Sequence, residues 1–452
     1  MDRGTIAALS TPSGRGGIAV IRISGDLAQG ILREIIEKVP EKIVKRKAVH
    51  SFIIDSGKRI EECVYTYFAL PDSYTGEDVI EISIHSNPFL TETILNLIFS
   101  KGARNALPGE FTFRAFKNKK IDLIQAESIN ELINANSKYF AEMKFGNLEG
   151  KLSLFLKGLK ELLISLAVKI ETTIEFQEEN SIKEIDFIPE LEAAKKKIDK
   201  IISGYRFNEV LDQGLKLVIV GKTNTGKSSL FNLLLLEDRS ITSPIPGTTR
   251  DFIRERIFLK GFPVELFDVA GINSESADDI EKLGISRSIE LVANSDAVIF
   301  LLDGSSDFDE NDRSIYRLIK DKKRAVFINK SDKLKSGIQA EIKNAFSSEQ
   351  ISTLSVLKNT GIENVYDFIY SVIDDIGENK TEISVNLRQK DLLAGISNSL
   401  NNANKMMKTN RTDIELIAEE IRLSIKKIGK LLGEVKDEDI INKIFSNFCI
   451  GK

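Results

Sequence analysis

One segment in the middle of the chain, Gly221 to Ser228 (GKTNTGKS), constrains the fold more than any other feature. It follows the apolar run LVIV and precedes the run SLFNLLLL, so a strand, a glycine-rich turn and a helix are expected in that order. Glycines allow successive backbone N–H groups to point inward at phosphate oxygens, and the positive end of the following helix favours an anion. A coincidental glycine-rich turn is the alternative, and this context disfavours it. The segment predicts a phosphate-binding loop in a doubly wound α/β domain.

Two further motifs follow in the order that a GTP-binding domain requires. Asp268-Val-Ala-Gly271 ends the strand-like VELF, and its Asp268 carboxylate is suited to hold the water shell of Mg²⁺. The Gly271 N–H is expected to sense the γ-phosphate. Asn329-Lys-Ser-Asp332 follows RAVFI, and the Asp332 carboxylate can accept both the ring N–H and the amino group of guanine. Adenine offers neither donor, so the sequence predicts binding and hydrolysis of GTP.

Other parts of this domain supply the remaining nucleotide contacts. Between the first two motifs lies Gly247 to Asp251, where we expect Thr249 to join Ser228 as a ligand of Mg²⁺. Leu354 to Leu357 is expected to pack on the carbonyl side of guanine, with Ser352-Thr353 as an alternative register. The expected GTP contacts are Asn224, Thr225, Gly226, Lys227, Ser228, Ser229, Ser243, Pro244, Ile245, Pro246, Gly247, Thr248, Thr249, Asp268, Val269, Ala270, Gly271, Asn329, Lys330, Ser331, Asp332, Ser355, Val356 and Leu357.

Hydrolysis of GTP needs a polar side chain that orients the attacking water, and this domain lacks one at the usual sequence position. Ile272 follows Gly271, whereas Ras-type GTPases place a water-orienting glutamine there. The nearest acidic source is the stretch Asp278 to Glu281. Arg250, Arg254 and Arg256 lie nearby, but a solvated strand edge explains them more readily than an arginine finger.

The periodicity of apolar residues divides the rest of the chain. Short apolar runs alternate with Gly, Pro and Asp before residue 118, which predicts an α/β domain over 1–118. Long stretches with helical spacing predict a helical domain made from 119–210 and 375–452, with the doubly wound domain inserted at 211–374. About three domains fit a chain of 452 residues.

Composition excludes several classes of protein. No apolar run approaches the roughly eighteen residues that cross a bilayer, and the first residues show no targeting signal, so a cytoplasmic protein without a membrane partner is expected. Two cysteines, Cys63 and Cys449, predict neither disulfides nor zinc, and packing explains Cys449 more readily than catalysis. The net charge of −4 leaves local basic patches as candidate RNA contacts, with solvated faces as the alternative: Lys45 to Lys47, Arg114 to Lys120 and Lys195 to Lys197.

The whole chain resembles the bacterial tRNA-modification GTPase family MnmE, also called TrmE. The motifs that carry the resemblance lie at Thr5 to Ile18, at Ser73 to Asp78 (SYTGED), at Pro108 to Thr112 (PGEFT) and in the terminal FCIGK. The resemblance implies a homodimeric GTPase that forms a heterotetramer with an FAD- and NADH-dependent flavoprotein, MnmG or GidA. Together they would add an aminomethyl or carboxymethylaminomethyl group at C5 of the tRNA wobble uridine, with 5-formyltetrahydrofolate or a related folate supplying one carbon.

The resemblance also implies roles for individual residues. Folate would be bound by Arg22, Glu81, Lys120 and Lys452. K⁺ would replace an arginine finger and would be bound by Asn224, Ser243, Ile245 and Thr248. Glu281 would be the catalytic residue. The chain departs from the family pattern at Ile84, Ser86, Asn87 and Phe113 near the folate motifs.

A second hypothesis is a switch protein of ribosome assembly, in which GTP controls an RNA-binding event. The flanking regions favour the first hypothesis, because an assembly factor is expected to append a basic RNA-binding module. The sequence leaves open which tRNAs are modified, whether glycine or ammonium provides the amine, and which residues contact RNA.

Overall fold

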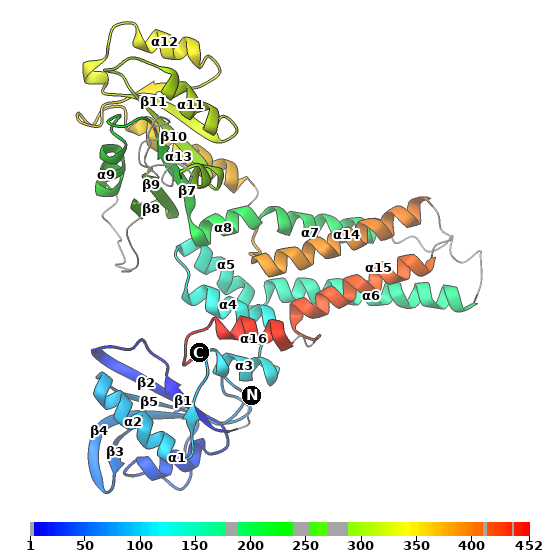
Figure 1. Ribbon diagram of the computed structural model, residues 1–452. Coiled ribbons are helices and arrows are strands. Elements are labelled where there is room, and N and C mark those ends of the chain that lie inside the picture. The colour runs from blue at the N-terminus through cyan, green and yellow to red at the C-terminus, as the bar shows by residue number, and fades with distance from the viewer. Residues whose placement is uncertain are drawn as a thin grey trace. The chain divides into compact units, whose positions relative to one another are not determined.

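The computed structural model describes residues 4–176, 188–237, 253–268, 288–378, 380–409, 414–435 and 438–452. They form two compact units, and each unit combines segments that are far apart in the sequence (Figure 1). The first unit contains Met1–Ile133, Lys144–Lys195 and Leu392–Lys452. The second contains Asn134–Met143 and Lys196–Asp391.

The first unit begins with a six-stranded sheet in the order β3-β4-β5-β2-β1-β6. Neighbouring strands are antiparallel except for the parallel pair β1 and β6. The strands are β1 (Ile6–Leu9), β2 (Gly16–Ser24), β3 (Ala48–Asp55), β4 (Lys58–Phe68), β5 (Val79–Ser86) and β6 (Arg104–Asn105). Two helices, α1 (Ala28–Ile35) and α2 (Pro88–Ser100), pack on one face of this sheet through Ile31, Leu32 and Ile94. Because strand side chains alternate between the two faces, the other face presents polar residues such as Arg22 and Glu81.

Helices from both ends of the chain complete the first unit. In Figure 1, α6 and α15 lie side by side, as do α7 and α14. Lys408 of α14 and Glu192 of α7 form an ion pair at 2.6 Å. The helices that lie wholly or partly in this unit are α3 (Glu110–Lys117), α4 (Leu123–Ile133), α5 (Lys138–Leu148), α6 (Lys151–Phe176), α7 (Ile188–Ser203), α14 (Leu387–Thr409), α15 (Ile414–Leu432) and α16 (Glu438–Ser446).

The second unit is built on another six-stranded sheet, in the order β12-β11-β10-β7-β9-β8, which is parallel except at β8. Its strands are β7 (Leu215–Val220), β8 (Ile253–Leu259), β9 (Phe262–Asp268), β10 (Ala297–Asp303), β11 (Lys323–Asn329) and β12 (Ile351–Thr353). Its helices are α8 (Tyr205–Gln213), α9 (Lys227–Glu237), α11 (Glu310–Ile319), α12 (Ile338–Ala345) and α13 (Glu363–Gly377), with a 3₁₀ turn at Ser331–Lys333.

Helices cover both faces of this parallel sheet. One core contains Leu230 and Phe231 of α9 together with Ile369 of α13, and the opposite core contains Ile315 of α11 and Ile342 of α12. Both faces of the strands are therefore apolar, as in β10, which is buried from Ala297 to Leu302. This arrangement confirms the predicted combination of an N-terminal α/β domain, a helical domain from two chain segments and an inserted doubly wound domain.

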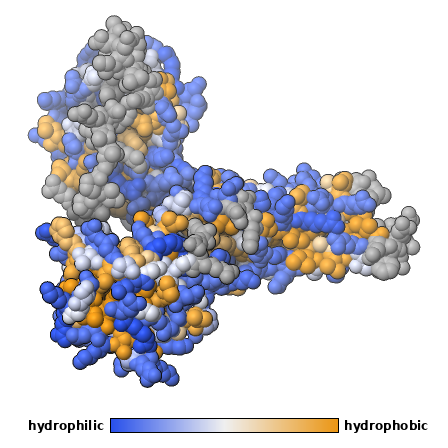
Figure 2. All heavy atoms as spheres, turned by 60° about the horizontal axis from the view of Figure 1, so that its bottom comes forward, coloured by the Kyte–Doolittle hydropathy of each residue, from blue (hydrophilic) through white to orange (hydrophobic). Residues whose placement is uncertain are grey.

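Hydrophilic side chains are spread over the face shown in Figure 2, with hydrophobic ones between them in small groups. Within the described part of the chain, no helix combines the length and the apolar character needed to span a membrane.

Candidate functional site

The predicted phosphate loop lies between β7 and α9, at the carboxyl end of the parallel strands. Gly226 has φ +99°, and a Cβ there would lie 2.3 Å from Asn329 Nδ2. A Cβ on Gly221 would lie 2.3 Å from the Leu301 carbonyl oxygen. Asn224, whose side chain is exposed, has φ +63°, a left-handed conformation that asparagine tolerates better than most residues. The loop therefore needs glycine at the two positions where other backbone or side-chain atoms approach it.

Lys227 and Ser228 begin α9 and face the loop. Lys227 is buried, and its Nζ donates to the carbonyl oxygens of Gly221 at 3.0 Å and Lys222 at 2.7 Å. Burial lowers the pKa of Lys227, and the Asp268 carboxylate opposes part of that shift. An anion between the loop and this ammonium would restore its preference for the charged form.

The Ser228 hydroxyl donates to Asp268 Oδ2 at 2.6 Å. The other carboxylate oxygen, Asp268 Oδ1, is buried without a hydrogen-bond partner in the described structure. A hydroxyl oxygen beside an incompletely satisfied carboxylate is a donor set that suits Mg²⁺, which prefers hard oxygen ligands. The two residues therefore fit the predicted role in metal binding.

The predicted guanine loop is tied directly to the phosphate loop. Asn329 is 3% exposed; its Nδ2 donates to the Thr225 carbonyl oxygen at 2.8 Å, and its Oδ1 accepts from the Val356 N–H at 3.1 Å. The Ser355 hydroxyl donates to Asp332 Oδ1 at 2.5 Å and lowers the pKa of Asp332. One asparagine therefore joins three loops, and the Asp332 carboxylate is held in its charged form.

The neighbours of this loop fix its backbone. Lys330 has φ +60°, and its Nζ lies 2.6 Å from Asp303 Oδ2. The Ser331 N–H donates to the Leu354 carbonyl oxygen at 3.0 Å. Ser352 and Thr353, the alternative register for the last loop, lie within β12, whereas Ser355 lies beside Asp332. Leu357 is exposed, and so is Ser229.

Sequence reasoning missed Lys222, the second residue of the phosphate loop. Its Nζ lies 2.7 Å from Asp312 Oδ2 and 3.0 Å from Asp309 Oδ2, at the start of α11. Burial alone would lower the pKa of Lys222, but hydrogen bonds to the two carboxylates outweigh it and raise the pKa. Burial raises the pKa of Asp312. Asp309 and Asp312 form a capping box, a pattern visible in the sequence, but their approach to Lys222 depends on the adjacency of β7 and β10.

Three of the four predicted folate residues lie close together: Arg22 and Glu81 on neighbouring strands of the N-terminal sheet, and Lys120 in the bend after α3. Arg22 donates from Nε and Nη2 to Glu81 Oε1 at 3.0 and 2.8 Å. Glu81 and Lys120 line one cavity of about 370 Å³, together with Tyr74, whose ring lies 5.3 Å from the Arg22 guanidinium carbon. The Lys120 ammonium donates to the Pro71 carbonyl oxygen at 3.0 Å.

The fourth predicted residue, Lys452, reaches the same region through the backbone. Its carbonyl oxygen accepts from the Phe111 N–H at 3.2 Å, and the Gly451 carbonyl oxygen accepts from Arg22 Nη1 at 3.5 Å. A Cβ on Gly451 would lie 2.1 Å from the Leu9 carbonyl oxygen, so glycine is required there. The residues that depart from the family pattern do not line the 370 Å³ cavity: Ile84, Ser86, Asn87 and Phe113.

Several predicted residues lie outside the described part of the chain. They are Ser243, Pro244, Ile245, Pro246, Gly247, Thr248, Thr249, Val269, Ala270, Gly271 and Glu281. Of the two cysteines, Cys449 is exposed, while burial raises the pKa of the Cys63 thiol to about 12.

Two family models match the chain. One is described as the GTP-binding protein TrmE N-terminus and covers residues 5–120. The other is described as the MnmE helical domain and covers residues 123–449. Among solved structures, Era from Aquifex aeolicus is 24% identical over 41% of this chain and 66% of that chain, with a TM-score of 0.30.

Curated relatives match along the full length. The tRNA modification GTPase MnmE of Thermotoga maritima is 38% identical over 99% of this chain and 100% of its own. The protein of the same name from Aquifex aeolicus is 38% identical over 100% of both chains, and that from Clostridioides difficile is 37% identical over 99% of both. These matches confirm the resemblance seen in the motifs, and the chain belongs to the MnmE family of tRNA modification GTPases.

Proposed function

We propose that this chain binds and hydrolyses GTP and uses this activity in the modification of tRNA. The observation that carries the proposal is the meeting of the phosphate loop, Asp268 and the guanine loop at the carboxyl edge of one parallel sheet. Doubly wound folds bind ligands at this edge, where the strand order changes direction. Family membership supports the connection to tRNA.

The described residues divide the work of binding. Backbone N–H groups of the loop at Gly226 and the Lys227 ammonium neutralise the phosphates, and the helix start at α9 adds its positive end. Ser228 and Asp268 would hold Mg²⁺, which would supply positive charge to stabilise the charge that develops on the phosphates. The Asp332 carboxylate would bind guanine, and the Ser355 hydroxyl would hold this carboxylate in position.

For hydrolysis we propose Glu281 as the group that orients water, and Thr249 as the second protein ligand of Mg²⁺. We propose that K⁺ is bound by Asn224, Ser243, Ile245 and Thr248. A monovalent cation near the β–γ bridge would stabilise the developing charge, as a guanidinium does in other GTPases. The exposed side chain and left-handed backbone of Asn224, at the tip of the loop, are consistent with this role.

For the N-terminal domain we propose a folate site formed by Arg22, Glu81, Lys120 and Lys452. Arginine and lysine suit the carboxylates of a folate tail, and a glutamate suits the donor edge of its pterin. The pairing of Arg22 with Glu81 and the cavity shared by Glu81 and Lys120 support this proposal. Folate would supply one carbon to the wobble uridine.

We further propose that the protein acts in the cytoplasm as a homodimer and forms a heterotetramer with an MnmG-like flavoprotein, through which FAD and NADH take part. The product would be an aminomethyl or carboxymethylaminomethyl group at C5 of the tRNA wobble uridine. The family name of the relatives supports the tRNA substrate.

The test is a nucleoside analysis of tRNA from a strain that lacks this protein. We expect unmodified wobble uridines, restored by the wild-type chain and by the matched control Lys58→Ala but not by Lys227→Ala. Normal wobble uridines in the deletion strain would favour the ribosome-assembly switch instead. The K⁺ site is tested separately by GTP hydrolysis in KCl and in NaCl, where equal rates would exclude it.

A further inference from the structure

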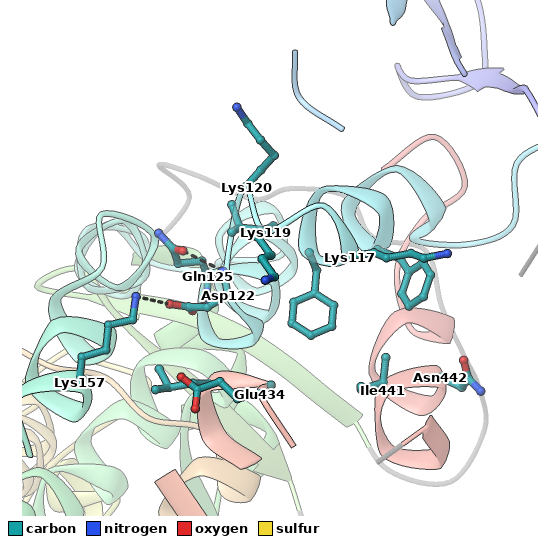
Figure 3. Close-up of a pocket in the computed structure, with 14 residues that line it drawn as sticks. Lys117, Lys119, Lys120, Asp122, Gln125, Lys157, Glu434, Ile441 and Asn442 are labelled. Carbon is teal, nitrogen blue, oxygen red and sulfur yellow. Dashed lines mark hydrogen bonds and ion pairs between the residues drawn. The ribbon is translucent and has the colours of Figure 1, made fainter. Parts of the chain in front are cut away.

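A second, larger cavity lies in the first unit, at the junction of α3, α4, α15 and α16. Its volume is about 930 Å³, within the range of pockets that hold ligands. Figure 3 shows Lys117 at the end of α3, Lys119 just beyond it and Lys157 of α6 among the lining residues, together with Glu434, which follows α15, and with Ile441 and Asn442 of α16. Among the described residues of the nucleotide site, none lines this cavity, so the nucleotide does not account for it.

The cavity is positively charged. Four lysines line it, Lys117, Lys119, Lys120 and Lys157, against the two carboxylates of Asp122 and Glu434. Within the described residues, the ammonium groups of Lys117 and Lys119 have no hydrogen bond or ion pair. The Glu434 carboxylate is paired outside the cavity, whereas Asp122 Oδ2 is buried without a hydrogen-bond partner among the described residues.

Asp122 Oδ1 accepts from the Gln125 N–H at 3.0 Å at the start of α4, and Asp122 Oδ2 lies 3.7 Å from Lys157 Nζ (Figure 3). Glu434 pairs with Lys160, which lies outside the lining. The lining thus carries two more lysines than carboxylates, and this excess of positive charge favours an anionic ligand.

One wall of the cavity is apolar and aromatic. Phe113 and Phe116 are half-buried and pack on Phe445, at centroid distances of 5.3 and 6.1 Å. Gly433 has φ +78°, and a Cβ there would lie 2.6 Å from the Phe116 ring. The glycine therefore allows this ring to lie against the backbone at the cavity wall.

Lysines beside partly exposed aromatic rings are a combination that binds unpaired nucleotides. Bases of single-stranded RNA stack on aromatic side chains while basic residues follow the backbone. A duplex buries its bases, so it could use only the lysines. A free phosphate would leave the aromatic wall without a role.

We propose that this cavity binds an unpaired segment of the RNA substrate, with phosphates at Lys117 and Lys119 and a base against Phe116. The inference rests on the proposed function, which supplies the RNA. Lys120 lines both this cavity and the smaller one that contains Glu81. An RNA strand held here would thus lie next to the proposed folate site.

The structure also shows which residues of the basic segment from Arg114 to Lys120 are available to bind RNA. The Arg114 side chain is 6% exposed and pairs with Glu77 and Glu110 at 2.8 and 2.9 Å. It is therefore structural, and the lysines that follow it are the groups available to a ligand.

The experiment measures binding of a short fluorescein-labelled oligouridylate to the full chain by fluorescence polarisation at several KCl concentrations. For Lys117→Gln/Lys119→Gln we expect the slope of log K against log [KCl] to become shallower by about 1.4, because each phosphate contact on a single strand contributes about 0.7. For Phe116→Leu we expect about tenfold weaker binding and an unchanged slope. A duplex RNA should compete poorly.

The matched control is Lys42→Gln/Lys58→Gln, which neutralises two exposed lysines of the same domain and should keep the wild-type affinity and slope. Lys117→Arg/Lys119→Arg should also keep the slope, which separates loss of charge from misfolding. GTP hydrolysis should be unchanged in every variant.

A wild-type slope in Lys117→Gln/Lys119→Gln would overturn the cavity as an RNA site and leave the proposed function intact. Wild-type affinity in Phe116→Leu would overturn the stacking role. If instead the wild-type chain binds neither tRNA nor oligouridylate and the deletion strain has normal wobble uridines, the proposed function itself fails.

Discussion

Asn329→Ala is expected to weaken the second unit and its nucleotide site together. The substitution removes two hydrogen bonds and leaves the Thr225 carbonyl and the Val356 N–H without their partner. Each buried polar group left unpaired costs about 1–3 kcal/mol, so the free energy of unfolding should fall by about 2–6 kcal/mol. Most domains are stable by about 5–15 kcal/mol, so the variant should fold but with a reduced margin.

The assay combines urea unfolding, followed by circular dichroism, with titration of a fluorescent GDP analogue. We expect the affinity for the nucleotide to fall at least tenfold, because the phosphate and guanine loops lose their link. Asn364→Ala is the matched control. It removes one longer hydrogen bond, from Nδ2 to the Gly361 carbonyl oxygen at 3.3 Å, and should cost less than about 1 kcal/mol.

A double-mutant cycle sharpens this test. Gly226→Ala alone places a Cβ 2.3 Å from Asn329 Nδ2, so part of its cost is a clash with that side chain. In the Asn329→Ala background the clash disappears, and Gly226→Ala should cost less than in the wild type. Unchanged nucleotide affinity in Asn329→Ala, or additive effects in the cycle, would refute the proposed link between the loops.

Two further predictions concern single carboxylates. Asp332→Asn should weaken GTP binding at least tenfold and improve binding of xanthosine triphosphate, whose 2-carbonyl can accept from the new amide; titrations with both nucleotides decide this. Glu110 accepts from Arg104 and Arg114, and although burial alone would raise its pKa, these hydrogen bonds lower it below 4.5. Its carboxylate therefore stabilises the fold above about pH 4.5, and this contribution is lost as the pH falls through the lowered pKa. Glu110→Gln should lower the free energy of unfolding by about 3 kcal/mol at pH 7 and by much less in acid. Urea unfolding at several pH values measures this difference. An equal loss of stability at every pH would contradict the role of the charge.

The meeting of the predicted nucleotide-binding motifs at one edge of the sheet could be foreseen, because the motifs are local and the geometry of parallel strands is general. The phosphate loop follows β7, Asp268 ends β9 and Asn329 ends β11, and parallel strands place their carboxyl ends at one edge of a sheet. The sequence also contains the capping box at Asp309 and Asp312. It does not show that Lys222 meets those carboxylates, because the contact depends on which strands are neighbours.

The larger cavity could not be predicted for a related reason. Phe116 and Gly433 belong to segments at opposite ends of the sequence, and no local pattern indicates that they touch. For Arg114 the sequence suggested the wrong environment, because its place within a basic run indicated an exposed patch. Glu110 precedes it by four residues on α3, but Glu77 lies far away in the sequence, and only the folded chain reveals that Arg114 is buried.

The pairing of α6 with α15 constrains the order in which the chain can fold during synthesis. The ribosome produces α6 first, then the segment Lys196–Asp391 of the second unit, and only afterwards the helix against which α6 packs. Until then the buried side chains of α6, such as Leu156 and Leu163, lack this partner. The inserted unit can form earlier, because its own core is contained between its ends. The apolar cluster around Leu123 is completed even later in synthesis, because it includes Phe445 and Phe448. A nascent chain arrested within α15 would thus carry a finished nucleotide unit beside an exposed apolar surface, and such a species is a natural substrate for chaperones.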